Sequence, residues 1–281
     1  MFIPYTPKYP LSLFIDCLWR VKGQTATGKE KILPTEHMEL IINFGGYHRA
    51  AMNPSNPEHF QINKEAWIVG LHTQHLLVES LGNSDMIGIR FKPGGGSAFF
   101  DFSMKELESK IIDMSLIWKS FIHEVRERVY EEENINNQFL ILEELLLKKL
   151  KYNKERFKII SPALDELNEM QSNTSTQFIS RKIGVSQKHL IQKFNENIGL
   201  TPNKLLRVLR FHQVLNSIDP SKDVSWLEVA LTNQYYDQAH FNKDFQAFTG
   251  MSPTEYISSR KEIYGEELQK GEDVKFVPLN R

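Results

Sequence analysis

The sequence has one cysteine, almost no net charge and no long apolar segment, and each shortage excludes a class of protein. The single thiol, Cys17, excludes a disulfide framework and a zinc site built from several cysteines. No apolar run approaches the ~18 residues that span a bilayer, and no secretory signal pattern opens the chain. We therefore expect a cytoplasmic protein without a membrane segment. The net charge of −1 argues against a uniformly basic surface for nucleic acid.

A motif repeated at a fixed spacing dominates the last part of the 281-residue chain. The two copies begin at Ser186 and at Asp237, and each later position of the motif recurs at the same offset. In each copy a good helix N-cap precedes an i, i+4 pair of apolar residues. A glycine then predicts the helix end, and Thr-Pro or Ser-Pro predicts the start of another helix. With a short helix upstream, each copy is a helix-turn-helix unit, and one helix from Pro202 to about Ile218 joins the two.

This arrangement resembles the DNA-binding region of the AraC/XylS family of transcription regulators, over about residues 161–260. The most specific part is the second unit, in which residues 235–241 are followed by Phe245, Phe248, Gly250, Ser252-Pro253 and Tyr256. The family usually has a glycine in the second turn, where this chain has Gln234. A left-handed residue other than glycine costs roughly 1 kcal/mol, so a rearranged turn is one expectation.

The resemblance implies a regulator that binds double-stranded promoter DNA and acts with RNA polymerase, without enzymatic activity or a cofactor. The second helix of each unit, which we call the reading helix, carries side chains suited to base edges: lysine for guanine, glutamine and asparagine for adenine, and small or apolar groups for the thymine methyl. The predicted DNA-reading residues are Lys188, Ile191, Gln192, Lys193, Asn195, Gln238, Ala239, Asn242, Lys243 and Gln246. The alternative is that they are only a solvated polar surface.

Charge is distributed unevenly between the two units. Residues 181–210 hold seven basic and one acidic side chain, whereas residues 211–260 hold three basic and six acidic ones. Phosphate neutralisation supplies most of the salt-dependent affinity for DNA, so we expect the first unit to dominate binding, with Lys193 and Arg207 among its contacts. Arg207 and Arg210 on the joining helix are candidates for phosphate contacts, and salt bridging is the alternative for both.

The first hundred residues predict a small β-barrel or sandwich, because short apolar strands alternate with glycine and proline. Residues 104–150 then predict helices, the last with a leucine-rich face that needs the barrel or a partner subunit to cover it. The expected class is α+β. The expected domains are 1–152 for sensing or dimerisation and 161–262 for DNA binding, with a charged linker at 153–160 and a mobile tail at 263–281. A homodimer through the N-terminal domain is expected.

The N-terminal domain also resembles that of one AraC-type subgroup whose function is poorly defined, through segments such as 38–45 and 87–95. An effector pocket for a small molecule is one expectation for it, although core packing is the alternative for its aromatic residues. The candidate lining residues are Trp19, Phe44, Trp67, His72 and Arg90. Five histidines could suggest a metal site: His37, His48, His59, His72 and His75. No His-x-His pair occurs among them, and we expect no metal site. A barrel-type enzyme or metal-binding domain fused to a DNA-binding module is the alternative, and no nucleophile–base motif supports it.

Overall fold

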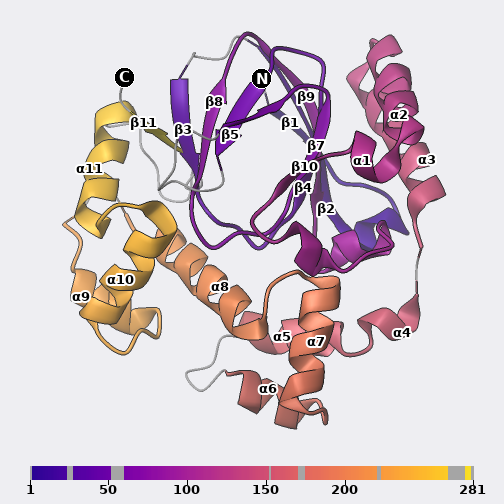
Figure 1. The fold of residues 1–281 in the computed structure, drawn as a ribbon. Coiled ribbons are helices and arrows are strands. Elements are labelled where there is room, and N and C mark those ends of the chain that lie inside the picture. Colours follow the sequence, from indigo (N-terminus) through magenta and orange to yellow (C-terminus); the bar gives the residue numbers. More distant parts are fainter. Residues whose placement is uncertain are drawn as a thin grey trace.

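A computed structural model describes residues 2–23, 28–51, 60–151, 153–169, 175–219, 223–264 and 276–279. Its N-terminal part consists of two sheets with flanking helices, and its C-terminal part is a set of helices that lies beneath and beside the sheets (Figure 1). This is the α+β organisation that the sequence predicts. No helix in these ranges is both long and apolar enough to cross a membrane.

The strands pair into two antiparallel sheets. Of the two predicted forms, the domain is therefore a sandwich and not a closed barrel. The strands are β1 (Phe2–Tyr5), β2 (Ile15–Gly23), β3 (Gly28–Ile32), β4 (Glu39–Asn43), β5 (His48–Ala51), β6 (Gln61–Asn63), β7 (Ala66–Val69), β8 (Leu76–Ser80), β9 (Ser84–Phe91), β10 (Ile111–Asp113) and β11 (Phe276–Leu279). One sheet has the order β1-β2-β9-β4-β7-β10 and the other β11-β3-β8-β5-β6.

Strand β4 shows how the pleat divides side chains between two apolar layers. Leu40 and Ile42 are fully buried in the large core, whereas Ile41 between them packs on a smaller cluster that contains Trp67. That cluster also includes Ala50 and Leu76, which belong to the second sheet. The smaller cluster is therefore the layer between the sheets, and the large core lies on the other face of the six-stranded sheet.

Three helices flank the six-stranded sheet: α1 (Ser115–Trp118), α2 (Ser120–Glu131) and α3 (Ile135–Lys149) (Figure 1). Helices α1 and α2 are separated by Lys119, whose φ is +52°. The leucine-rich face of α3 is covered mainly by this chain's own core, since Leu142, Leu145 and Leu146 are buried. Leu140 and Leu147 are left 44% and 45% exposed.

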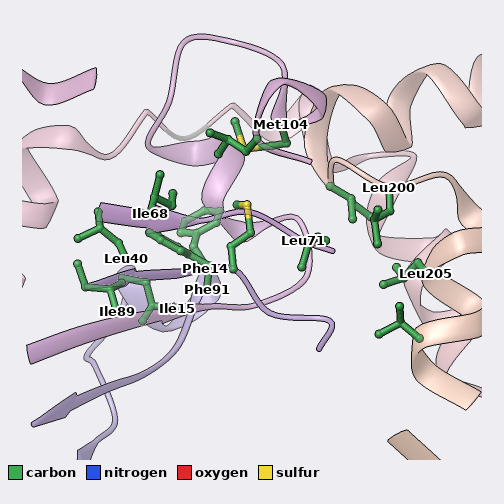
Figure 2. Close-up of a cluster of buried hydrophobic side chains, with 14 of the residues drawn as sticks. Phe14, Ile15, Leu40, Ile68, Leu71, Ile89, Phe91, Met104, Leu200 and Leu205 are labelled. Atoms are coloured by element: carbon green, nitrogen blue, oxygen red, sulfur yellow. The ribbon is translucent and has the colours of Figure 1, made fainter. Parts of the chain in front are cut away.

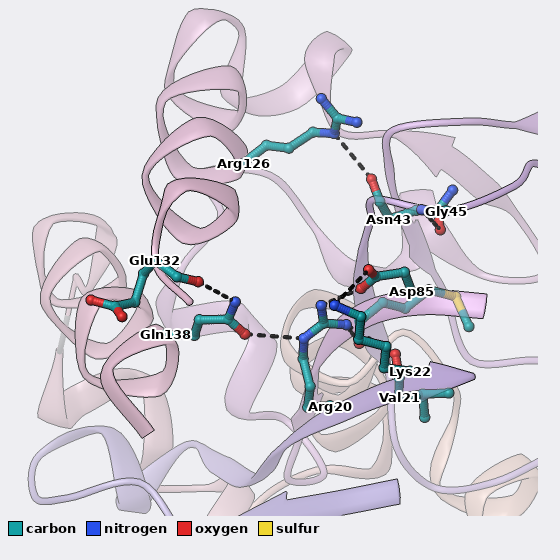
Figure 3. Close-up of polar contacts among 10 residues, drawn as sticks. Arg20, Val21, Lys22, Asn43, Gly45, Asp85, Arg126, Glu132 and Gln138 are labelled. Carbon is teal, nitrogen blue, oxygen red and sulfur yellow. Dashed lines mark hydrogen bonds and ion pairs between the residues drawn. The ribbon is translucent and has the colours of Figure 1, made fainter. Parts of the chain in front are cut away.

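A polar network ties α2 and α3 to the sheet, and nothing in the sequence pattern pointed to it. Buried Arg20 on β2 donates from Nε to Gln138 Oε1 of α3 at 3.0 Å and forms an ion pair with Asp85 of β9 (Figure 3). Gln138 donates in turn to the Glu132 carbonyl at 2.7 Å. Arg126 of α2 donates to the carbonyl of Asn43 at 3.0 Å. The buried charge is thus paired and hydrogen-bonded, as a buried arginine must be.

The C-terminal helices include both predicted helix-turn-helix units and the helix that joins them. They are α4 (Lys154–Phe157), α5 (Ile160–Glu169), α6 (Thr176–Lys182), α7 (Gln187–Asn197), α8 (Pro202–Ser217), α9 (Trp226–Thr232), α10 (Gln238–Thr249) and α11 (Pro253–Tyr264). Helix α8 runs from the first unit, α6 and α7, to the second unit, α9 and α10 (Figure 1). The prediction of a joining helix near 202–218 is confirmed.

Two connecting segments differ from their expected form. The charged segment 153–160 contains helix α4, because Asn153 Oδ1 accepts from the amide of Glu155 and Phe157 packs against Phe14. The tail expected to be mobile supplies β11, whose residues 276–279 pair with β3 at the edge of the second sheet. The apolar sequence Phe-Val-Pro-Leu suits an edge strand, since proline is tolerated there.

The two domains share one continuous apolar core. Met104, in the 3-10 helix η3 (Met104–Leu107), belongs to the same buried cluster as Leu200 and Leu205 of the C-terminal domain (Figure 2). Next to this cluster Lys204 of α8 forms an ion pair with Glu108 at 2.6 Å. The N-terminal domain therefore packs directly on the DNA-binding helices.

Candidate nucleic-acid interface

The first unit has the geometry that its capping residues predict. Ser186 Oγ accepts from the amide of His189 at 3.2 Å and starts α7. Gly184 in the turn has φ +74°, and a Cβ there would meet no atom within 4 Å. Glycine is thus used at this position for its left-handed backbone and not for space. Thr201 Oγ1 caps α8 by accepting from Lys204 N at 3.4 Å.

The second unit repeats this geometry, but the left-handed position of its turn is not a glycine. Asp237 Oδ1 accepts from the amide of His240 at 2.7 Å and starts α10. Gln234 takes the left-handed conformation, with φ +62°, so the turn keeps its shape despite the missing glycine. Tyr235 donates its amide to the Ala230 carbonyl at 3.0 Å, just as Val185 donates to Ser180 at 3.0 Å in the first unit. The expectation of a rearranged turn is therefore wrong for its hydrogen bonds.

The second turn does contain one more residue than the first. Val185 is followed directly by the capping Ser186, whereas Tyr236 stands between Tyr235 and the capping Asp237. The Tyr236 side chain is 88% exposed. The inserted residue thus bulges into solvent while the residues on each side keep the positions of the first unit.

On the first reading helix, α7, the predicted DNA-reading residues are unequally accessible. Lys188 and Gln192 are exposed, and Ile191, Lys193 and Asn195 are half-buried. Glu196 accepts from Gln192 Nε2 and from Lys193 Nζ, both at 2.7 Å. One acidic residue that the sequence prediction left aside therefore holds two of the five predicted residues.

The C-terminal end of α7 touches the N-terminal domain. Ser103 Oγ donates to the carbonyl of Asn195 at 3.1 Å, and Asn195 Oδ1 is buried without a hydrogen bond from the described residues. At Gly199, with φ +97°, a Cβ would lie 2.7 Å from the carbonyl oxygen of Met104. Only glycine fits this contact, and Asn195 faces the domain interface and not open solvent.

On the second reading helix, α10, most of the predicted face is open. Ala239, Asn242, Lys243 and Gln246 are exposed, and Gln238 is half-buried. Inward, Phe241 and Phe245 are fully buried, as the i, i+4 pattern predicts. His189 is half-buried and His240 is exposed, and His240 makes an edge contact with the Tyr235 ring.

Arg207 on α8 connects the joining helix to the second unit. It donates from Nε and Nη2 to the two carboxylate oxygens of Asp244 on α10, at 3.2 and 2.7 Å, and lies over the Phe248 ring. This is the salt-bridge alternative that the sequence left open. Arg210 is half-buried, and its positive charge lies near Tyr235. Burial raises the pKa of the Tyr235 hydroxyl, so this group is neutral at pH 7.

The positive charge of the first unit is largely compensated in the folded chain. Four of its cations have acidic partners: Lys182 with Glu166, Lys193 with Glu196, Lys204 with Glu108, and Arg207 with Asp244. Among the described residues no ion pair involves Arg181, Lys188 or Arg210. Of these three, Arg181 and Lys188 are exposed, and Arg210 is half-buried.

The five effector candidates do not form one site. Trp19 and Trp67 lie in one row across the six-stranded sheet, in register with Gly88 and Ile41. Trp19 covers Gly88, where a Cβ would lie 2.0 Å from the indole. Arg90 lies two residues after Gly88 on β9 and pairs with Glu39 at 2.8 Å. These three candidates belong together on the face towards the second sheet.

The other two effector candidates lie elsewhere. Phe44 packs near Arg20, Arg126 and Tyr130 on the helix-covered side. His72 is buried in a loop, where its Nδ1 contacts the carbonyl of Gln74 at 2.5 Å and burial lowers its pKa. Within the described residues no group of three histidine, cysteine or acidic side chains has metal-binding geometry. His59, one of the histidines considered for a metal, lies outside the described residues.

Two parts of the chain match known protein families. Residues 179–259 match the family model described as "Helix-turn-helix domain", and residues 4–113 match "Domain of unknown function (DUF6597)". An uncharacterized HTH-type transcriptional regulator of Staphylococcus aureus is 22% identical over 211 residues, which are 65% of this chain and 28% of that protein. The chain thus spans less than a third of that relative.

Two solved structures are distantly similar. ToxT from Vibrio cholerae aligns with 11% identity and a TM-score of 0.48, over 86% of this chain and 98% of its own. The AraC-like transcriptional activator CuxR aligns with 10% identity and a TM-score of 0.28, over 75% of this chain and 86% of its own. The assignment rests on the family match over 179–259 and on the two capped units. Residues 179–259 are thus a helix-turn-helix domain of the AraC type that the sequence resembles, and residues 4–113 match a domain family of unknown function.

Proposed function

We propose that the chain regulates transcription by binding promoter DNA in the cytoplasm, with both units reading one bipartite site, and that it has no enzymatic activity. The observation that supports this most is the pair of matched, capped reading helices joined by α8 and pinned by the Arg207–Asp244 pair. Lys188 and Gln192 are displayed on one helix, and Asn242 and Gln246 on the other. RNA polymerase is the proposed partner at the promoter.

Fluorescence anisotropy with the DNA upstream of the protein's own gene tests this proposal. The full chain should bind that DNA at least about 10³-fold more tightly than scrambled DNA of equal length. Gln192→Ala combined with Asn242→Ala should remove most of this preference. Asn136→Ala, an exposed residue at the start of α3 far from either unit, is the matched control and should bind like the wild type. Equal affinity for both DNAs across a salt series would contradict the proposal.

We propose that the N-terminal domain controls the regulator through a small molecule. This molecule would bind on the face of the six-stranded sheet that is turned towards the second sheet. Trp19 and Trp67 on that face supply flat apolar surface, and the Arg90–Glu39 ion pair supplies charged groups of both signs, a set that suits a largely apolar molecule with polar groups. Native mass spectrometry of the protein purified from its own host is the test. The proposal predicts that the wild type retains a small molecule and that Trp67→Ala does not. If both proteins have the mass of the free chain, the proposal is wrong.

We propose that the chain forms a homodimer through α3. Leu140 and Leu147 are seven residues apart on this helix and both exposed, the spacing of a helix–helix seam. In sedimentation, Leu147→Glu should shift the full chain towards monomer at tens of micromolar. Leu231→Glu on α9, where the leucine is 56% exposed, is the control and should leave the association unchanged. A wild type that is monomeric under these conditions would refute the dimer.

A further inference from the structure

Both reading helices end against the N-terminal domain. Gly199 follows the end of α7, and a Cβ at this position would lie 2.7 Å from the carbonyl oxygen of Met104. Gly250 follows the end of α10, and a Cβ there would lie 2.5 Å from Cε1 of the His75 ring. The corresponding end of each reading helix is therefore in close contact with the N-terminal domain.

Polar side chains of the N-terminal domain also bind carbonyl groups at these two helix ends. Ser103 Oγ donates to the carbonyl of Asn195 on α7 at 3.1 Å. Lys31 Nζ donates to the carbonyl of Thr249 on α10, also at 3.1 Å. The last four carbonyls of a helix have no amide of the same helix to accept from, and a cation near them suits the helix dipole. We call these two hydrogen bonds the anchor bonds, one for each unit.

The joining helix α8 is held by the same domain at two points along its length. Lys204, in the first turn of α8, forms an ion pair with Glu108 at 2.6 Å. Further along the helix, His212 Nε2 lies 2.7 Å from the carbonyl of Pro34. The N-terminal domain thus contacts the DNA-binding helices from the end of α7, along α8, to the end of α10 (Figure 1).

The parts of the N-terminal domain that make these contacts are themselves firmly placed. Lys31 lies on β3, in register with Leu77 of β8, and is only 9% exposed. Met104 is fully buried in the core that also contains Leu200 and Leu205. Two attachment points on one packed domain fix the distance between the elements that they hold. The N-terminal domain should therefore set the distance between the reading helices together with α8.

The distance between the reading helices decides which DNA they can bind at the same time. One additional base pair between two half-sites moves the second half-site by about 3.4 Å along the duplex axis. It also turns that half-site by about a tenth of a turn, since one helical turn holds about 10 base pairs. A rigid pair of helices therefore fits one spacing, whereas a pair with freedom at one end fits several.

We propose that the N-terminal domain fixes the spacing of the two DNA half-sites, and that Lys31 is the residue that positions the second reading helix. The proposal rests on the proposed function, because it concerns DNA that both units read. Lys31 is too buried to contact DNA and acts through the end of α10. The second unit depends on its anchor bond more than the first, because apolar packing around Met104 also holds the first unit.

Affinities for a series of operators test the role of Lys31. The half-sites are those that the full chain selects from randomised DNA, and the spacing between them is changed by one or two base pairs in either direction. To bind a wrongly spaced operator the wild type must break an anchor bond, and it should lose on the order of tenfold in affinity, the worth of a hydrogen bond from a charged donor. Lys31→Met has no such bond to break, so its preference for the original spacing should be weaker by at least about threefold.

Two further variants separate positioning from a general effect of charge or stability. Lys29→Met is the matched control, because Lys29 is an exposed lysine of the same strand, and it should keep the wild-type preference. Lys31→Arg retains a charged donor and should keep most of the preference. The preference is a ratio of two affinities of one protein sample, so partial unfolding of a variant does not change it.

A distance measurement without DNA tests the positioning directly. Spin labels on Gln192→Cys of α7 and Gln246→Cys of α10, both at exposed positions in a Cys17→Ser background, report the distance between the reading helices by electron paramagnetic resonance. With Lys31 present, the distribution of distances should be narrow. Lys31→Met should broaden it, because the end of α10 is then no longer fixed to β3.

The outcomes distinguish this proposal from the proposed function. A wild-type spacing preference or a wild-type distance distribution in Lys31→Met would overturn the positioning role and leave α8 to set the spacing. Specific binding by the wild type at every spacing would overturn it as well, with the proposed function intact. Binding without any sequence preference would refute the proposed function, and the distance measurement would still decide whether Lys31 positions α10.

Discussion

The two helix-turn-helix units are built alike and anchored differently. In both, a capped reading helix ends at a left-handed glycine that touches the N-terminal domain, Gly199 in the first unit and Gly250 in the second. The first glycine meets a backbone carbonyl, that of Met104, whereas the second meets the side chain of His75. The N-terminal domain therefore holds the first unit through backbone and apolar core, and the second through ionisable side chains.

This difference gives the two units different parts in a shared task. The first unit is fixed to the N-terminal domain by apolar burial around Met104, Leu200 and Leu205, which does not depend on pH. The second unit is held by two ionisable side chains: Lys31 of β3 donates to the Thr249 carbonyl at 3.1 Å, and the His75 ring lies against Gly250. A signal in the N-terminal domain should move the second unit more readily than the first.

The largest expected effect comes from filling the two glycine contacts. Gly199→Ala should destabilise the chain by about 3 kcal/mol, because the left-handed strain adds to a clash with a backbone oxygen that has no room to move. Gly250→Ala should cost only about 1–2 kcal/mol, since the His75 ring can turn aside. Urea unfolding of both variants measures the difference. Equal losses would show that the two contacts are equivalent.

A smaller effect should distinguish the units on DNA. Asn242→Ala removes an exposed side chain suited to adenine and should cost about 2 kcal/mol at the second half-site only. Affinities for operators mutated in one half-site at a time give the measurement. If the variant loses discrimination at both half-sites or at neither, the second reading helix acts as a backbone clamp.

Lys188 on α7 and Arg207 on α8 should differ although both are cations of the segment 181–210. Lys188→Ala removes an unpaired exposed charge and should lower the salt dependence of binding by about one ion, weakening all DNA sequences alike. Arg207→Ala leaves buried Asp244 without its partner and should cost about 1–2 kcal/mol of folding stability. Binding isotherms between 50 and 200 mM salt, a range in which such slopes are clear, together with thermal melts, separate the two. A salt slope that falls only in Arg207→Ala would reverse these assignments.

The smallest effect concerns the second turn. Gln234→Gly should stabilise the chain by up to about 1 kcal/mol, because glycine adopts the observed φ of +62° without strain. Gly184→Ala is the reciprocal change in the first turn and should destabilise by a similar amount, since a Cβ there meets no neighbour and only the backbone strain remains. Chemical unfolding gives both values, and a destabilised Gln234→Gly would mean that the glutamine side chain has a role of its own.

The sequence predicted the local features of the C-terminal domain because each is set by a few neighbouring residues. Ser186, Thr201 and Asp237 cap the helices as expected, and Phe241 and Phe245 are buried as their spacing indicates. The acidic partner of Arg207 could not be predicted from the sequence, whereas the acidic partner of Lys193 could be. Glu196 lies three residues from Lys193 and was a visible signal, whereas Asp244 lies 37 residues from Arg207 and depends on how α8 crosses α10.

In the N-terminal domain the strands were predictable and their assembly was not. Short apolar strands were expected in the first hundred residues, and β4 (Glu39–Asn43) is one of them, but the apolar pattern of a strand does not say which strands lie beside it. Likewise the five effector candidates are of suitable types, yet Phe44 and Trp67 lie on opposite faces of the six-stranded sheet. Register and face depend on contacts between distant segments, and a single sequence does not contain them.

Selection of binding sites from randomised DNA by the full-length protein tests the central claim most directly. Two reading helices joined by α8 should recover a bipartite site whose halves are about one helical turn, or ~10 bp, apart. The half read by α7 should be the stricter, and the half read by α10 should be richer in A·T pairs, because Asn242 and Gln246 suit adenine. Recovery of a single short motif, or of no motif at all, would contradict the account that both units read DNA.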